Sequence, residues 1–590
     1  MLKSNPPTKG ENQTPLTPTR QRNAPFIKCD VLLDPACGSG NFLTETYLSL
    51  RKIENIILAQ LNDDQQALGF EDVGISPVKV SLDQFYGLEI NDFAVRVAST
   101  ALWIAELQAN AETAAIVTRT IEDLPLRESA HIRQANALTT DWTEVLDPGR
   151  CSYVLGNPPF LGARNQGGSQ KPDLTAALAE AGATKNVGNI DYVGGWYAKA
   201  ARYSVGTDMR CAFVSTNSIV QGEQVANLWY PLSQLGVHID FAHDTFRWSN
   251  ESSSQAHVFC VIVGFSHGDR KPKTLFHHEG PDAPAEKRVT EQLNYYLAPA
   301  KNMFVRSRTK PLSDVPNIGI GNKPVDGGGG NYLFSAEEMR EFIEGEPGAE
   351  KYFRPWVESK EFIEGREWWC LYLGEAEFGD LNKLPLVMDR VRAVRDFRLS
   401  RNSATTKKIA DRPTKFHVEK VPEGTSVVIP KVSSERRPRI PVGFMDPSTL
   451  CSDLVFLIPE ADLYHFGILQ SSTHNVWVDA VCGRLKSDYR YSKKVVYNNF
   501  IWPTVDSPTR ESIVNAASEV LESRKKYPDA KIKDLYDPDN DFMFPELGVA
   551  HKKLDELVLA AYGLPSDAED PEILAHLFEL YDQATADENG

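Results

Sequence analysis

Two short motifs in this 590-residue sequence carry residue types that could do chemistry together. The first, DPACGSGNF at 34–42, places two glycines after an aspartate, and the second, GNPPF at 156–160, places an asparagine before two prolines. Gly38 and Gly40 can take positive φ and let the backbone approach a bound group closely. No Lys-Ser/Thr follows them, which excludes a phosphate-binding P-loop. The first motif therefore predicts a cofactor loop.

The GNPPF motif is suited to activating a weakly nucleophilic amine. Two prolines end a strand abruptly and stiffen the loop, so its polar groups are held in place. The adenine N6 amine is such a nucleophile, because its lone pair is delocalised into the ring. The Asn157 side-chain oxygen and the Pro158 carbonyl could accept its two N–H groups, and Phe160 could stack on a base flipped out of the helix. Alone, the motif also fits a proline turn with a buried Phe.

The apolar runs predict the elements that must hold these motifs. Such runs lie at 29–34, 84–89, 151–155, 211–215, 237–242 and 257–265, and helical patterns separate most of them, as at 91–109 and 191–204. Strands alternating with helices indicate a mainly parallel sheet covered on both faces. The last two runs are close together and are expected to form an antiparallel edge. Each motif thus follows a strand, where cofactor and catalytic loops are commonly found.

Two further positions extend the expected cofactor site. Glu89, at the end of the second run, could accept hydrogen bonds from both hydroxyls of a ribose. It lies 49 residues after Gly40, where about 20 is usual, and we attribute the excess to an insertion near 60–80. Asn136, in ANAL at 135–138, is placed to contact the adenine ring of a cofactor. Either residue alone also fits an ordinary position at a strand end.

In this order, the two motifs resemble those of the amino-methylating DNA methyltransferases of the gamma arrangement, in which target recognition lies C-terminal. NPPF suits adenine-N6 enzymes, and the Pro-Cys of the cytosine-C5 class is absent. The resemblance extends over roughly residues 30–565 to the single-chain type IIL restriction-modification enzymes. It is carried by DYVGGWYAKAA (191–201), STNSIVQGEQV (215–225), FRWSNESSSQAHVFCVIVGF (246–265), RPWVESKEFIEGREWWCLYL (354–373) and RYSKKVVYNNFIWP (490–503).

This resemblance implies an α/β, Rossmann-like class I methyltransferase fold and S-adenosylmethionine as the cofactor. Asn157, Pro158, Pro159 and Phe160 would act on the target base, and Trp248 would help wall its pocket. The cofactor-binding residues it implies are Asp34, Pro35, Ala36, Cys37, Gly38, Gly40, Asn41, Phe42, Glu89, Ile90, Asn136 and Ala137.

Composition along the chain predicts four segments. Residues 1–28 are polar and proline-rich and are expected to be disordered. The methyltransferase domain is expected over 29–315 and an α+β target-recognition domain over 316–505, with the boundary at the glycine-rich stretch 316–331. A helical segment is expected over 506–590, with helices at 508–525 and 548–562 joined by a loop.

The net charge of −17 is unusual for a protein that binds nucleic acid, but its distribution is uneven. Residues 381–500 hold 20 Lys and Arg against 12 Asp and Glu, so this part is basic within an acidic chain. Double-stranded DNA is therefore the expected partner, with most contacts to phosphates. Candidates for guanine edges are Arg436, Arg437, Arg439, Arg484, Lys486 and Arg490. For each of them a solvated surface charge remains the alternative.

Several features of the sequence indicate where the protein is located and which partners it has. The sequence has no apolar stretch of membrane-spanning length and no signal-peptide pattern, and its scattered cysteines fit a reducing cytoplasm without zinc. About 30 residues precede DPACGSG, so the nuclease and helical spacer of the type IIL enzymes are not expected within this chain. A partner polypeptide or another defence-system subunit could supply them. Glu358-Ser-Lys360 is interpreted as structural, and no DNA cleavage is predicted.

Two other functions stay open. Protein-glutamine methyltransferases also use Asn-Pro-Pro-aromatic, although they lack a long basic C-terminal module. A non-catalytic DNA-binding specificity subunit of a restriction or phage-defence complex would keep the fold without the reaction. The intact GNPPF argues against that second alternative.

Overall fold

The structure is a computed structural model that describes residues 30–68, 78–117, 130–248, 258–280, 282–328, 331–485 and 487–586. The expected disordered extension at 1–28 lies outside these ranges. Two compact units are present: one contains the described residues up to Asn157 together with Thr207–Cys211, and the other contains Pro158–Gly206 and the chain from Ala212. No described helix is both long enough and apolar enough to cross a membrane.

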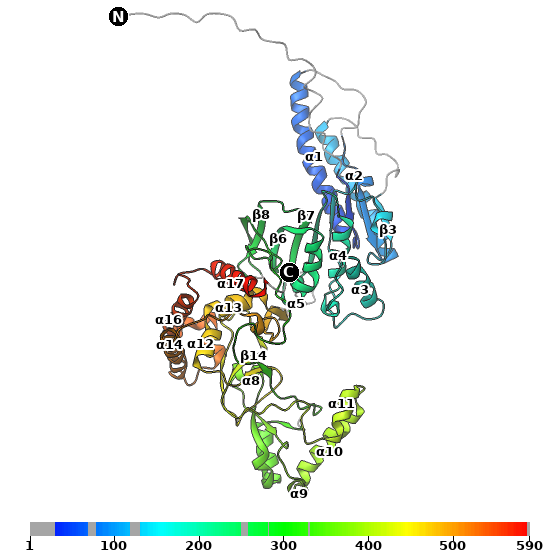
Figure 1. Ribbon diagram of the computed structural model, residues 1–590. Coiled ribbons are helices and arrows are strands. Elements are labelled where there is room, and N and C mark those ends of the chain that lie inside the picture. Colours follow the sequence, from blue (N-terminus) through cyan, green and yellow to red (C-terminus); the bar gives the residue numbers. More distant parts are fainter. Residues whose placement is uncertain are drawn as a thin grey trace, which may run out of the picture. The chain divides into compact units, whose positions relative to one another are not determined.

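The first unit is built on four parallel strands in the order β3-β2-β1-β4. Their bounds are β1 Leu32–Asp34, β2 Phe85–Glu89, β3 His131–Gln134 and β4 Tyr153–Gly156. Two long helices, α1 Asn41–Leu68 and α2 Asp92–Val117, connect them and lie side by side (Figure 1). This confirms the expected strand–loop–helix setting of the glycine motif. The long α1, with 28 residues, accounts for much of the extra distance between Gly40 and Glu89.

A buried polar cluster fixes α1 against α2. The Arg51 guanidinium donates to Asn110 Oδ1 at 2.9 Å and to Thr113 Oγ1 at 2.7 Å, and it lies 3.3 Å from the Glu54 carboxylate. Around it, apolar side chains such as Leu43 and Phe85 complete the core of this unit. Because a buried charge without partners is costly, this network sets the position of α1, whose first residue is Asn41 of the cofactor motif.

The second unit contains α3 Gln170–Glu180, α4 Gly194–Tyr203 and strands in the order β5-β7-β6-β8-β9, of which β5 begins with two residues assigned to the first unit. These strands are β5 Arg210–Thr216, β6 Val237–Trp248, β7 Val258–His267, β8 Lys273–His278 and β9 Ala285–Thr290. The short helices α5 Gly222–Gln224 and α6 Tyr230–Gln234 precede β6. The expected antiparallel pairing of β6 with β7 is confirmed. Its expected place at the sheet edge was wrong, because β8 pairs with β6 and β9 pairs with β8.

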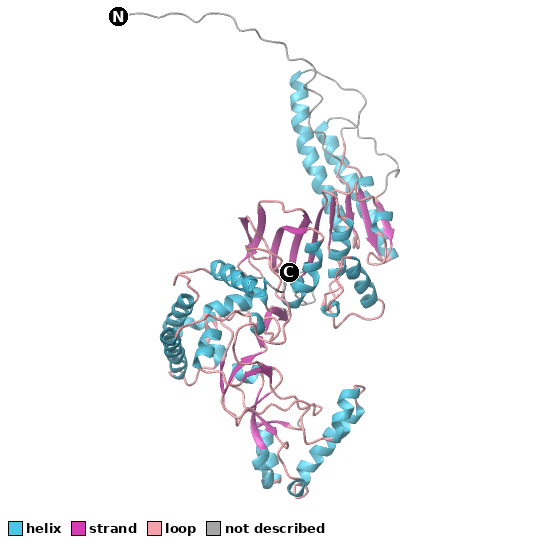
Figure 2. Ribbon diagram, in the orientation of Figure 1, coloured by secondary structure: helices cyan, strands magenta, loops and turns pink. Residues whose placement is uncertain are grey.

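The region from 319 to 490 is α+β, with three small sheets (Figure 2). Their strand orders are β10-β18-β14-β16, β11-β13-β12-β17 and β15-β20-β19. The strands are β10 Gly319–Ile320, β11 Leu333–Ser335, β12 Phe353–Val357, β13 Trp368–Leu371, β14 Ser426–Pro430, β15 Val432–Ser433, β16 Gly443–Met445, β17 Leu450–Cys451, β18 Val455–Ile458, β19 Gly483–Leu485 and β20 Asp488–Arg490.

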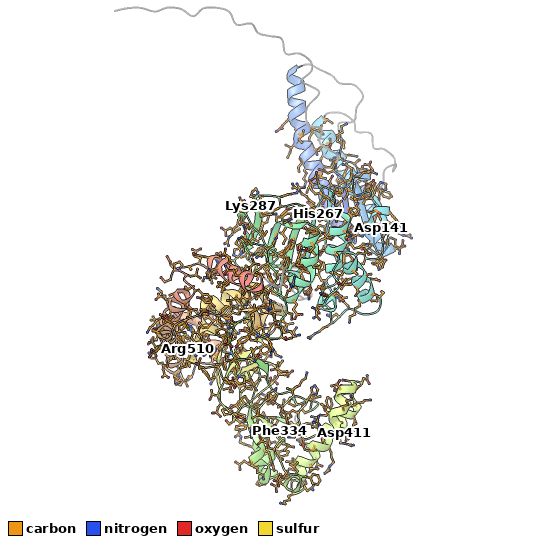
Figure 3. All side chains as sticks on the ribbon, in the orientation of Figure 1. Asp141, His267, Lys287, Phe334, Asp411 and Arg510 are labelled. Atoms are coloured by element: carbon orange, nitrogen blue, oxygen red, sulfur yellow. The ribbon has the colours of Figure 1, made fainter. Side chains whose placement is uncertain are left out.

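Side chains from helices within 336–400 complete an aromatic core around the β11-β13-β12-β17 sheet. Phe334, labelled in Figure 3, packs edge-on against Phe342 and Phe353 in that core. The helices of this region are α7 Ala336–Gly345, α8 Ser359–Glu364, α9 Phe378–Leu381, α10 Pro385–Ser400, α11 Ala404–Lys408, α12 Leu463–Gln470 and α13 Ser472–Val481. Buried Arg398 of α10 donates to five backbone carbonyls, including those of Val325 and Ile409, and so ties the surrounding loops together.

The chain continues as a helical segment made of α14 Ser507–Lys525, α15 Ile532–Leu535, α16 Pro545–Ala561 and α17 Asp570–Thr585. The two expected helices are present. The stretch 535–548 between them, expected as a loop, begins at the last residue of α15 and contains a 3-10 turn at Pro538–Met543 and the start of α16. Proline at the first position of a helix fits its fixed φ and needs no amide donor there, which explains why the turn and α16 each begin at a proline.

Candidate active site

The DPACGSGNF loop leaves β1 at Asp34 and is fastened at several points. Asp34 is buried, and its Oδ1 accepts a hydrogen bond from the Ala36 N–H at 2.9 Å. The Cys37 N–H donates to the Leu88 carbonyl at 3.1 Å, which ties the loop to β2. Gly40 has φ +86°, and a Cβ there would lie 2.9 Å from the Ala98 Cβ. Only glycine fits this position, for both conformational and steric reasons.

Glu89 joins the glycine loop to the start of α2. Its Oε2 accepts the Gly38 N–H at 3.1 Å, and its Oε1 accepts the Asn91 N–H at 2.8 Å. A carboxylate offers about four lone-pair sites, so acceptor capacity remains for two hydroxyl groups. Gly38 has φ +55°, and no atom lies within 4 Å of where its Cβ would be. The Glu89 carboxylate can therefore still accept hydrogen bonds, and there is free space next to Gly38. This arrangement fits the ribose hydroxyls of a nucleoside cofactor.

The local environment changes the acidity of Asp34. The pKa of this carboxyl is raised from 3.8 to about 7, mainly because burial penalises its charged form; the bond from the Ala36 N–H lowers the pKa, and the nearby Glu89 charge raises it. Desolvation penalises the charged form of a buried acid. Asp34 is therefore a carboxyl whose charge a bound cation would stabilise. S-adenosylmethionine carries two cationic groups, so the side chain fits that cofactor as well.

The remaining predicted cofactor residues lie around the carboxyl ends of β1, β2 and β3, the end at which ligands bind in parallel sheets. Asn136 Oδ1 accepts from the Leu138 N–H at 3.1 Å, and the Ala135 N–H donates to the Glu89 carbonyl at 2.8 Å. Ile90 is 67% exposed and could cover a planar ring. Asn41 is exposed and Phe42 half-buried, whereas Pro35, Cys37 and Ala137 are buried, with Ala36 between these extremes.

The GNPPF loop begins where β4 ends, directly beside β1. Leu32 and Leu33 pair in parallel with Tyr153 and Val154. Gly156 is pressed against Asp34, because a Cβ at residue 156 would overlap Asp34 Oδ1. The two motifs are therefore adjacent in space. This contact explains why the residue before Asn157 is a glycine, which the sequence motif alone does not reveal.

Asn157 presents an acceptor that is buried and unused. Its Oδ1 is inaccessible to solvent, and no donor to it exists in the described part of the chain. Buried polar atoms in proteins are almost always hydrogen-bonded, so an exception calls for an explanation. Pro158 is buried, Pro159 exposed and Phe160 half-buried. Trp248 ends β6, with its ring 6.2 Å from Phe246, and the stretch after it, 249–257, lies outside the described residues.

The predicted DNA-contacting arginines gather around the β15-β20-β19 sheet. Arg490 is exposed and ends β20. Arg484 stacks on Tyr489 at 4.3 Å and pairs with Asp479 at 2.5 Å. Arg436 pairs with Asp539 at 2.5 Å, and half-buried Arg437 donates to Ser433. The side chain of Lys486 lies outside the described residues.

Arg439 has a different environment. Both oxygens of Asp555 in α16 accept from its guanidinium, at 3.0 Å and 2.5 Å, and the two side chains are each 16% exposed. A bidentate pair of this kind uses the same donor fork that would read a guanine edge. Among the described predicted residues, Arg439 and Arg484 are thus both held by protein partners, Arg439 by Asp555 and Arg484 by Asp479.

One polar residue of the site was missed from the sequence. Asp191 is 4% exposed and its Oδ1 accepts the Leu161 N–H at 3.1 Å, one residue beyond GNPPF. The only signal was its place at the head of the run DYVGGWYAKAA, where it reads as the start of a helix. Glu358, by contrast, accepts from its neighbour Trp356 at 3.2 Å, in agreement with a structural interpretation.

Comparison with known proteins assigns this chain to a family. Residues 10–277 match "MmeI, DNA-methyltransferase domain", residues 299–504 match "MmeI, target recognition domain", and residues 505–588 match "MmeI, C-terminal domain". A solved structure of the type IIL restriction-modification enzyme MmeI in complex with DNA is 39% identical. It superimposes with a TM-score of 0.86 over 95% of this chain and 73% of that one. The chain belongs to the MmeI family.

Two curated relatives of the MmeI-like chain are also informative. "DNA methyltransferase A" of Bacillus subtilis (strain 168) is 41% identical over 557 residues, which cover 94% of this chain and 61% of that protein. "Adenine-specific methyltransferase PglX" of Streptomyces coelicolor is 25% identical over 162 residues, 23% of this chain. This chain therefore spans less than two thirds of its relative from Bacillus. The mixed α/β fold with a mostly parallel sheet agrees with the methyltransferase expectation.

Proposed function

We propose that this chain transfers a methyl group from S-adenosylmethionine to the N6 amino group of an adenine flipped out of double-stranded DNA. The observation that carries the proposal is the buried, unused acceptor of Asn157, directly after β4, in the same unit as a glycine loop whose Gly38 N–H donates to the Glu89 carboxylate. A target amine is the donor that this oxygen lacks. The family's DNA-methyltransferase and target-recognition domains support DNA as the substrate.

The chain's residues would divide the work as follows. Glu89 would accept the ribose hydroxyls, Asp34 would face the cofactor's cationic end, and Asn136 with Ile90 would hold its adenine. When bound, the cofactor supplies an electrophilic methyl group on a sulfonium. Stacking of the flipped base on Phe160 would offset part of the unstacking energy, which amounts to about a few kcal/mol.

Asn157 would act by orienting the nucleophile. Its Oδ1 and the Pro158 carbonyl would each accept one N6–H, which draws the nitrogen lone pair out of conjugation with the ring. An amide oxygen is an acceptor and not a base at neutral pH, so it would hold the N–H groups in place during attack. The N–C bond would form as the bond from the methyl carbon to sulfur breaks, with a neutral thioether as the leaving group, and water would take one N6 proton. Rigid acceptors cost no reorganisation at the moment of reaction, and the two prolines supply that rigidity.

The basic surface would bind DNA and select the site. Arg490, Arg484, Arg436 and Arg437 lie around one small sheet within the matched target-recognition region. Contacts to phosphates would set orientation, and one or two of these guanidiniums would reach guanine edges. Such a protein would work in the cytoplasm within a restriction-modification or phage-defence system.

The test compares Asn157→Ala with Asn165→Ala, an exposed asparagine in the loop that follows the motif. Labelled methyl transfer from S-adenosylmethionine to unmethylated bacteriophage DNA is measured. Losing one group from a pre-organised site costs about 10²–10³ in kcat, so Asn157→Ala should lose activity on this scale while still binding the cofactor. Asn165→Ala should retain it. A fully active Asn157→Ala enzyme would contradict the proposed role of Asn157.

A further inference from the structure

Asp191 lies at the centre of a hydrogen-bond network beside the catalytic motif. Its Oδ1 accepts from the N–H groups of Leu161 at 3.1 Å and Val193 at 3.4 Å. Its Oδ2 accepts from the hydroxyls of Thr216 at 3.1 Å and Ser218 at 3.4 Å. All four donors are neutral groups. The carboxylate thus gathers a loop, a helix start and the carboxyl end of β5 onto one buried side chain.

The residue that Asp191 holds is fixed on its other side as well. The Leu161 carbonyl accepts from the Tyr192 N–H at 3.0 Å and from the Gln166 Nε2 at 3.1 Å. Gln166 also donates to the Ile190 carbonyl at 3.0 Å. The N–H and the carbonyl of Leu161 are therefore both hydrogen-bonded, the N–H to Asp191 and the carbonyl to Tyr192 and Gln166.

The turn itself is anchored to rigid structure. The Asp191 N–H donates to Gln224 Oε1 at 2.9 Å, which attaches the turn to α5. Thr216 is the last residue of β5, and Ser218 lies in the 3-10 turn that follows. A displacement of Leu161 would break its bonds to Asp191, Tyr192 and Gln166. Leu161 directly follows Phe160 in the chain and lies four residues after Asn157.

We propose that Asp191 is a positioning residue for methyl transfer, which through Leu161 fixes the loop that carries Asn157, Pro158 and Phe160. The inference rests on the proposed function of that loop. Asp191 contacts the loop and not the reacting atoms, so it acts by restricting where the acceptors and the aromatic ring stand. Misplacement of a reacting geometry by about 1 Å can cost 10²-fold in rate.

Three variants of the full chain test this role. Asp191→Ala removes all four acceptor contacts. Asp191→Asn keeps an oxygen for the Leu161 N–H, and its amide can donate to the Thr216 hydroxyl, which can also accept. Asn294→Ala is the matched control, because buried Asn294 Oδ1 accepts two backbone N–H groups, from Tyr296 at 2.9 Å and Ala298 at 3.0 Å, away from this loop.

Two readouts keep the inference separate from the proposed function. Hydrogen exchange of peptides covering 158–166 should be faster in Asp191→Ala and unchanged in Asn294→Ala, whether or not the enzyme is active. With bacteriophage DNA, Asp191→Ala should lower kcat by about 10- to 100-fold with the cofactor Kd within twofold, and Asp191→Asn should restore most of it. Unchanged exchange, or a kcat loss equal to that of Asn294→Ala, overturns the positioning role. An inactive wild-type chain overturns the proposed function instead.

Discussion

Burial gives the Asp34 carboxyl a higher pKa than that of an exposed aspartate. Its pKa is raised to about 7, first by desolvation and further by the Glu89 charge. The unfolded chain releases this proton near the ordinary value of 3.8. Between pH 4 and 7 the folded chain therefore holds a proton that the unfolded chain has lost, so Asp34 lowers the free energy of unfolding as the pH rises through this window.

This predicts a pH dependence that Asp34→Asn should reduce. We expect the wild-type chain to lose stability relative to the variant between pH 5 and pH 8, by about 1.4 kcal/mol for each unit of pKa difference expressed in that range. S-adenosylmethionine, as a cation, should bind the wild type more tightly at pH 8 than at pH 6. Urea unfolding and calorimetric titration at both pH values measure the two effects. Parallel stability curves for wild type and variant would show that Asp34 titrates normally.

At the residue scale, the sequence could predict those site residues that stand in contiguous motifs. The residues of 34–42 and 156–160 share a loop with their neighbours, so their spacing in sequence is close to their spacing in space. Asp191 could not be found in this way, because it contacts Leu161 across 30 residues and Thr216 across 25. The contact of Gly156 with Asp34 likewise depends on β4 lying beside β1, which only the fold provides.

At the element scale, the methyltransferase strands were predictable because each is a short apolar run bounded by helical patterns. β2, β4, β5 and β7 coincide with the expected runs within about two residues. The strands of the target-recognition region could not be predicted from the sequence. Several of them have only two or three residues, which is too short for an alternation of apolar and polar residues to be visible. Their pairings are also distant, as in β12 with β17, where Trp356 lies opposite Leu450.

The contact of the 434–442 loop with the helical segment yields a prediction at this scale. Asp555 accepts from Arg439 and from the Ser472 N–H at 2.7 Å, so it joins the loop to both α16 and the start of α13. Removing one member of a buried ion pair leaves an uncompensated charge and costs about 3–5 kcal/mol. We expect Asp555→Ala to lose stability on this scale in urea unfolding.

Two further variants test whether the Arg439–Asp555 pair causes the expected loss of stability. The double variant Arg439→Ala/Asp555→Ala should recover part of the loss, because no buried charge is left behind. Arg436→Ala, which removes a 58% exposed arginine and its pair with Asp539, should cost no more than about 1 kcal/mol. Equal losses for Asp555→Ala and Arg436→Ala would mean that the Arg439 pair is not the stabilising contact we infer.

At the scale of the whole molecule, three matched regions follow one another along the chain, from a methyltransferase domain to a target-recognition domain and a C-terminal domain. The excess of basic residues falls within the second of these, at 381–500. This distribution explains how a chain with a net charge of −17 can still bind a polyanion, because local potential and not total charge attracts a ligand at physiological salt.

The most direct test of the account is the identity of the methylated product. Purified chain is incubated with labelled S-adenosylmethionine and unmethylated bacteriophage DNA, and the DNA is digested to nucleosides for mass spectrometry. With the wild-type chain we expect label in N6-methyladenine, and with Asn157→Ala we expect none. Label in a methylated cytosine, or in protein glutamine with none in DNA, would contradict it.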